Sequence, residues 1–178
     1  LGDVYKRQPV ARLYMRKMVG HLVLDAESDA LNKILDKAAE SGEQLNLNLL
    51  GEAVLGEEEA KSRAQRTLKL IQNPRVTYVS VKASSMVAQL NHWDIDGSVE
   101  RLKERLRPLY QAAADRTDKV FINMDMEEYH DLHLTIRLFK ELLSEPEFLT
   151  LDAGIVLQAY LPDTFDAVSY THLRAHET

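Results

Sequence analysis

VTYVSVKAS (residues 76–84) indicates the fold most clearly, because polar side chains occupy alternate positions toward its carboxyl end. Alternate side chains of a β-strand face opposite sides of its sheet. Ser80 and Lys82 therefore share one face, opposite Val79 and Val81. The segment predicts a strand with one apolar face and one face that becomes polar as the strand ends.

Three further segments show the same alternation, with a helix-patterned stretch between each pair: LNLNLLGE (45–52), KVFINMDME (119–127) and AGIVLQAY (153–160). Their polar positions are Asn46, Asn48 and Glu52, then Asn123, Asp125 and Glu127, then Gln158 and Tyr160. Strands that alternate with helices predict a parallel α/β sheet. Helices on both sides would leave both faces apolar, whereas a barrel that holds a ligand can be polar near its mouth. The pattern favours a (β/α)8 TIM-like barrel.

Helical spacing of apolar residues and helix-end signals predict five helices around these strands. Asparagine-proline at 73–74 is expected to close one helix, and Pro108 is expected to kink or subdivide another. The predicted helices cover about 9–24, 28–41, 57–73, 98–114 and 129–143.

The two ends of the chain, residues 1–8 and 168–178, resemble the two strands of one sequencing-adapter oligonucleotide in translation. We expect both ends to be adapter-derived and exclude them from fold reasoning. The remaining residues, 9–167, are then expected to be a partial barrel domain. A complete barrel needs roughly 250 residues, so this segment should hold about the first four β/α units.

Composition narrows the class of protein. The formal net charge is −6, which argues against a nucleic-acid partner, because such partners need a basic footprint. The absence of cysteine excludes a disulfide framework and thiolate chemistry in these residues. No apolar run approaches the length of about 18 residues expected of a membrane span. We expect a cytoplasmic protein, or one peripheral at the inner membrane.

Lys82 is the least ordinary candidate for chemistry, because an ammonium in a strand flanked by valines is costly to bury unless it is paired. We expect Asp125, at the end of the next strand, to be its partner. Lys82 could anchor an anionic substrate, act as a Schiff-base nucleophile, or snorkel into solvent at the rim. Asp125 and Glu127 share a face and could bind a metal, exchange protons or orient a cation.

The remaining candidates are less specific. Glu127-x-x-His130 has the spacing of a di-iron helix motif, but it spans a strand end and a helix start, so no metal site is expected there. His92 and Trp93 could form a lid over a planar ligand or simply cover core. Glycine-rich nucleotide loops, a Gly-x-Ser-x-Gly motif and metal-spaced Cys/His sets are absent from the sequence.

Taken in order, LNLLGEAVLGEEEA, YVSVKAS, FINMDMEEY and GIVLQAY resemble the proline dehydrogenase domain of bifunctional bacterial proline-utilization flavoproteins. The resemblance implies a distorted (β/α)8 barrel with FAD at its carboxyl-terminal mouth, which oxidises L-proline to Δ1-pyrroline-5-carboxylate. It also implies a quinone or other electron acceptor and a C-terminal aldehyde dehydrogenase domain in the parent protein.

The resemblance assigns roles to four residues. It makes Lys82 a ligand of the proline carboxylate, Asp125 an acid close to that lysine and the flavin, and Gln158 a hydrogen-bond partner of the isoalloxazine ring. Glu52 would pair with a substrate-binding arginine when the site closes. That arginine and most FAD-binding loops would lie beyond residue 167, so we expect the chain alone to be inactive. The alternatives are a Schiff-base aldolase that uses Lys82, and an inactive truncated scaffold.

Overall fold

The computed structural model describes residues 11, 13–15, 18–19, 29–49, 54–165 and 168–169. The chain divides into two compact units, residues 1–43 and 44–178. The described part of the first unit contains α2 (Asp29–Glu40), which buries Leu31, Leu35 and Ala38 along one side. Most of the helix predicted at 9–24 lies outside the described residues.

A four-stranded parallel sheet organises the second unit, with its strands in the sequence order β1-β2-β3-β4. The strands are β1 (Leu47–Asn48), β2 (Tyr78–Lys82), β3 (Phe121–Asp125) and β4 (Ala153–Val156). Each lies inside its predicted segment and is shorter than it. The α/β class and the parallel sheet are therefore confirmed.

Helices alternate with these strands: α3 (Glu57–Gln72), α4 (Ile95–Ala114) and α5 (Leu132–Leu143). Short 3-10 turns precede or follow them, η1 (Ala83–Ser85), η2 (Tyr129–Asp131) and η3 (Pro146–Phe148). The end of α3 at Asn73 is as predicted. The helix α4 begins earlier than predicted, because Asp94 caps it by accepting a hydrogen bond from the Gly97 N–H. It also continues through Pro108, so the predicted subdivision there is wrong.

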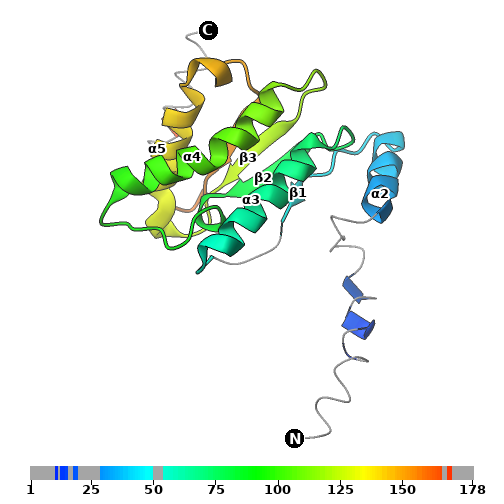
Figure 1. Cartoon of the computed structure of the whole chain (residues 1–178), viewed down its shortest axis with the longest axis horizontal. Coiled ribbons are helices and arrows are strands. Elements are labelled where there is room, and N and C mark those ends of the chain that lie inside the picture. Colours follow the sequence, from blue (N-terminus) through cyan, green and yellow to red (C-terminus); the bar gives the residue numbers. More distant parts are fainter. Residues whose placement is uncertain are drawn as a thin grey trace, which may run out of the picture. The chain divides into compact units, whose positions relative to one another are not determined.

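The apolar face of the sheet forms the core of this unit. Val79, Val81, Ile122 and Met124 each have an exposed fraction of 1% or less. The helices α3 and α4 cover this face, and α5 packs beside α4 (Figure 1). Burying each such side chain stabilises the fold by about 1.5–3 kcal/mol. One face of the sheet is therefore packed against helices, and the opposite face is available for polar side chains.

The described strands form an open sheet, so closure into a barrel stays a prediction. No helix within the described ranges is long and apolar enough to cross a membrane.

Candidate active site

A row of hydrogen-bonded polar side chains crosses the sheet on the face opposite the apolar core. Asn46 Nδ2 on the chain entering β1 donates to Ser80 Oγ of β2 at 2.9 Å. Asn123 Nδ2 of β3 lies 3.4 Å from the same Ser80 Oγ and donates to Asp125 Oδ1 at 2.8 Å. Asn48 Nδ2 reaches Asp125 Oδ2 from β1 at 3.2 Å. The polar face predicted from the alternation is therefore confirmed for the first three strands.

Lys82, at the end of β2, pairs with Glu127 rather than with Asp125. Lys82 Nζ lies 2.5 Å from Glu127 Oε1, and the two side chains are 14% and 49% exposed. The backbone register does place Lys82 opposite Asp125. The predicted Lys82–Asp125 ion pair is nevertheless not observed, since the shorter Asp125 side chain lies back on the polar row, held by Asn48 and Asn123.

The Asp125 carboxyl is in an unusual electrostatic environment. Burial raises its pKa above the ordinary value of 3.8. Hydrogen bonds from Ser80 and Asn123 and the charge of Lys82 oppose this rise, while the charge of Glu127 adds to it. Asp125 is the one carboxyl group among the described residues whose pKa is shifted upward with burial as the largest cause. Shifts of this kind cluster at functional sites.

Gln158 lies just past β4 and joins the same edge of the sheet. Its Nε2 donates a hydrogen bond of 2.7 Å to the backbone oxygen of Glu127. The strand predicted to run through residue 160 ends at Val156, and the chain turns at 159–160. Gln158 still lies opposite Glu127, because continuing the β3–β4 register by two residues beyond Asp125 and Val156 pairs these two positions. Glu52, the fourth predicted site residue, lies outside the described residues.

Sequence reasoning missed the central position of Glu127. This glutamate accepts an ion pair from β2 through its side chain and a hydrogen bond from the segment after β4 through its backbone. Strand alternation places Glu127 on the same face as Asp125 but does not identify Lys82 as its partner. The signal that could have identified this partner is the length of the glutamate side chain. Glu127 follows the strand end and has one more methylene than Asp125, so it can reach over the edge to Lys82.

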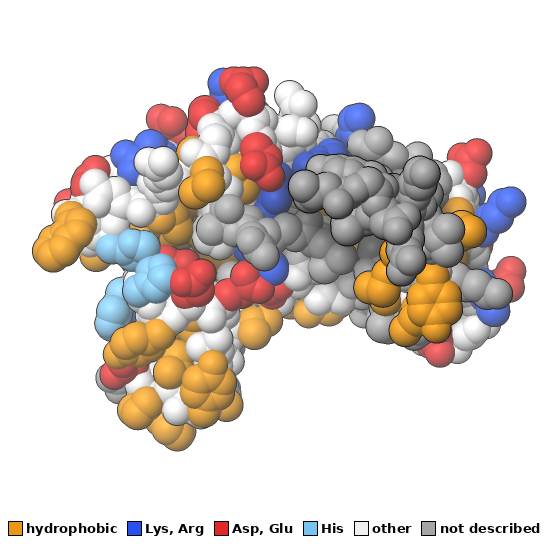
Figure 2. Space-filling model, turned by 90° about the horizontal axis from the view of Figure 1, so that it is seen from below, with side chains coloured by type: hydrophobic (Ala, Val, Ile, Leu, Met, Phe, Trp, Pro, Cys, Tyr) orange, Lys and Arg blue, Asp and Glu red, His pale blue; other side chains and the backbone are white. Residues whose placement is uncertain are grey.

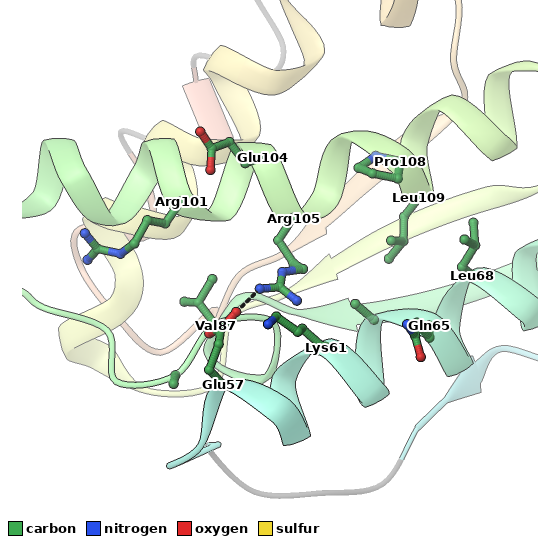
Figure 3. Close-up of a pocket in the computed structure, with 12 residues that line it drawn as sticks. Glu57, Lys61, Gln65, Leu68, Val87, Arg101, Glu104, Arg105, Pro108 and Leu109 are labelled. Atoms are coloured by element: carbon green, nitrogen blue, oxygen red, sulfur yellow. Dashed lines mark hydrogen bonds and ion pairs between the residues drawn. The ribbon is translucent and has the colours of Figure 1, made fainter.

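A groove elsewhere on the molecule does not coincide with this site. It has a volume of about 440 Å³ and lies between α3 and α4, lined among others by Lys61, Arg101 and Glu104. Figure 3 shows Arg105 of α4 pointing toward Glu57 at the start of α3, with which it forms an ion pair. The groove is therefore a charged seam between two covering helices, on the side of the sheet away from the polar row.

The fold and the site together define an α/β protein of the parallel-sheet class, with its polar candidate site at the carboxyl edge of consecutive strands. Residues 30–178 match the family described as proline dehydrogenase. The chain belongs to the proline dehydrogenase family.

Solved structures of similar proteins support the family membership. Proline utilization A (PutA) from Corynebacterium freiburgense is 65% identical with a TM-score of 0.84, over 89% of this chain and 16% of that chain. PutA from Bdellovibrio bacteriovorus, inactivated by N-propargylglycine, is 33% identical with a TM-score of 0.72, over 82% of this chain and 17% of that one.

The bifunctional protein PutA of Escherichia coli (strain K12) is 30% identical over 135 residues, or 70% of this chain. These residues are 10% of that protein, so the chain spans about a tenth of the length of the curated relatives it matches.

Proposed function

We propose that this chain is part of the barrel domain of an FAD-dependent proline dehydrogenase that oxidises L-proline to Δ1-pyrroline-5-carboxylate. In this proposal β1–β4 are the first four strands of a (β/α)8 barrel, and their polar face lines its interior. The observation that carries the proposal is the Lys82–Glu127 pair at the carboxyl edge of the sheet, in a chain of the proline dehydrogenase family.

Lys82 is suited to hold the carboxylate of proline. Its ammonium has three N–H donors, and Glu127 is the one acceptor it contacts among the described residues. Two donors thus remain for an anion. The side chain is only 14% exposed, so a carboxylate that reaches it would be partly withdrawn from water, where a charge-assisted hydrogen bond is stronger.

Glu127 and Asp125 would orient that ammonium rather than react. Glu127 fixes Lys82 Nζ by direct contact, while the Asp125 carboxylate, held by Asn48 and Asn123, adds negative charge behind it. Such positioning keeps the substrate in one geometry, which is the main contribution a protein makes to a cofactor-borne reaction. Glu52 would pair with an arginine outside this chain.

The residues at this edge fit a flavin ring. Gln158 Nε2 is engaged with Glu127, but its Oε1 accepts no hydrogen bond from the described residues, so it is available to a ring N–H. Asp125, with its raised pKa, is the other group we assign to the flavin side. FAD, when bound, would accept the hydride that leaves proline C5.

The whole protein would need more than these residues. We propose that it includes the rest of the barrel, an electron acceptor such as a quinone, and a C-terminal aldehyde dehydrogenase domain like that implied by the bifunctional relatives. We also propose that residues 1–8 and 168–178 are adapter-derived and that the isolated chain does not turn over proline.

The aldolase alternative finds no support in the environment of Lys82. Nucleophilic lysines are activated by an apolar pocket or by a neighbouring cation. Lys82 instead contacts a carboxylate.

The proposed activity can be tested in a chimera. Residues 30–165 of this chain would replace the matching segment of PutA from Corynebacterium freiburgense, to which the chain is 65% identical. We expect the purified chimera to show flavin absorbance and proline-dependent reduction of a dye. A folded, flavin-loaded chimera without proline-dependent dye reduction would contradict the proposal, provided that the unmodified relative is active in the same assay.

A further inference from the structure

Two histidines and an aspartate converge at the loops that follow β2 and β3. His92 Nε2 lies 2.6 Å from Asp131 Oδ1, and His130 Nε2 lies 3.6 Å from the same oxygen. The two imidazole rings meet edge to face with their centroids 4.5 Å apart. One potential ligand atom from each residue lies within 4.8 Å of the others. Figure 2 shows histidine side chains gathered beside acidic ones on this face of the molecule.

The backbone around both loops holds these side chains in place. On the β2 side, Asn91 N donates to Ser98 Oγ, which in turn donates to Asn91 O, so the residue before His92 is tied to the start of α4. On the β3 side, Asp131 N donates to Glu128 O within the turn η2. The cluster is therefore built on anchored backbone and not on free loop tips.

The Asp131 side chain is directed at the two histidines. Asp131 ends the turn η2 and directly precedes α5, and its side chain makes no hydrogen bond to a helix N–H. Its carboxylate is turned to His92 and His130, with only 8% of the side chain exposed.

The distances suit a tetrahedral metal ion after small side-chain rotations. Zinc binds imidazole nitrogen and carboxylate oxygen at about 2.0–2.2 Å, which places neighbouring tetrahedral ligand atoms about 3.3 Å apart. The observed nitrogen-to-oxygen distances of 2.6 and 3.6 Å lie on either side of that value. The three residues leave the fourth tetrahedral position to a water molecule.

We propose that His92, His130 and Asp131 form a binding site for a divalent transition-metal ion, with Zn²⁺ as its ligand. Imidazole and carboxylate groups are the ligands that suit this ion. The site joins the loop after β2 to the turn after β3. A bound ion would link the two loops and stiffen this edge of the sheet. This effect does not depend on the reaction that takes place at the edge.

The test is metal binding by the purified chain, freed of metal with a chelator. We expect Zn²⁺ to bind saturably in calorimetry, to raise the melting temperature, and Co²⁺ to give the visible absorption of a tetrahedral site. His130→Ala should weaken zinc binding about tenfold or more and abolish the melting shift. His130 is 57% exposed, so this variant should fold. His92→Ala is the second test from the other loop.

His133→Ala is the matched control, because His133 is an exposed histidine on the same segment that is not part of the cluster. It should bind zinc as the unmodified chain does. Zinc binding that is absent, that survives both His130→Ala and His92→Ala, or that falls equally in His133→Ala would overturn the proposal. The last two results would assign the binding to scattered surface histidines.

Discussion

The ammonium of Lys82 is held by Glu127, two residues beyond the aspartate that faces it across the sheet. The contact of 2.5 Å joins the end of β2 to the chain that leaves β3, while Asp125 is bound by asparagine side chains. The two carboxylates therefore have different tasks. Glu127 positions the Lys82 ammonium, and Asp125 is part of the row of hydrogen-bonded polar side chains that crosses the sheet.

Replacing Glu127 with glutamine should weaken substrate binding more than it weakens the fold. The neutral amide would leave the Lys82 ammonium less well oriented, so we expect the chimera to show a several-fold higher KM for proline. The stability loss should be about 1 kcal/mol, because Glu127 is half exposed. Steady-state kinetics and thermal unfolding measure the two effects. Glu128→Gln is the control, since its carboxylate faces His130; an equal rise in KM there would refute a specific role for Glu127.

Asp125→Asn should stabilise the chain at neutral pH and not in acid. Burial raises the pKa of Asp125 above 3.8. Between the pKa of the unfolded state and the higher pKa of the folded state, the folded chain keeps a proton that the unfolded chain has released. The free energy of unfolding therefore falls as pH rises through this range, and above it the buried charged carboxylate destabilises the fold. Denaturant unfolding at pH 7 and near pH 4 should show the gain in Asp125→Asn shrinking at the lower pH. A stability gain in Asp125→Asn that grows at lower pH would contradict the upward direction of the pKa shift.

The sequence predicted the polar row well, because alternation alone decides which face of a strand a side chain takes. Ser80, Asn123 and Asp125 lie together as their spacing required. Alternation does not report how far a side chain reaches, so it could not separate Asp125 from Glu127 as the partner of Lys82. Gln158 lies two residues past the end of β4 and still reaches Glu127, in keeping with the continued register of β3 and β4.

Contacts between loops could not be predicted from the sequence either, because strand alternation describes only residues within one strand. His92 and Asp131 are far apart in the chain and meet because β2 and β3 are neighbours. Strand order was predictable only as a class of topology, and the loop conformations that aim these side chains depend on local hydrogen bonds such as those of Ser98. The expectation of no metal site rested on the spacing of Glu127-x-x-His130 and on the absence of metal-spaced Cys/His sets, and spacing along the chain does not report pairs such as His92 and Asp131 that meet between loops.

Gly154→Ala should destabilise the sheet and disturb the polar row. A Cβ at Gly154 in β4 would lie 2.8 Å from Phe121 Cζ and 3.1 Å from Asn123 Oδ1. Relieving these contacts should cost about 1–3 kcal/mol, measured by denaturant unfolding. Gly56→Ala is the matched control, since a Cβ there meets nothing within 4 Å. An equal loss of stability at both positions would contradict crowding as the cause.

Tyr110→Phe should leave the fold as stable as before or stabilise it by up to about 1 kcal/mol. The Tyr110 hydroxyl on α4 is fully buried, and among the described residues it has no hydrogen-bond partner. Burial accordingly raises the pKa of this phenol. Tyr129→Phe offers a contrast, because the Tyr129 hydroxyl donates to Asp163 at 2.7 Å. A clear loss of stability in Tyr110→Phe would mean that its hydroxyl is bonded in solution.

Lys82 is proposed to hold the carboxylate of proline, and kcat/KM of the chimera with Lys82→Met tests this role. Loss of a charge-assisted hydrogen bond worth about 1.5–3 kcal/mol should lower kcat/KM by about 10- to 150-fold. Lys61→Met, in the seam between α3 and α4, should leave it unchanged. We expect a large loss of kcat/KM for Lys82→Met alone, mainly through a higher KM, with flavin still bound. Unchanged kcat/KM in a folded, flavin-loaded Lys82→Met chimera would contradict it.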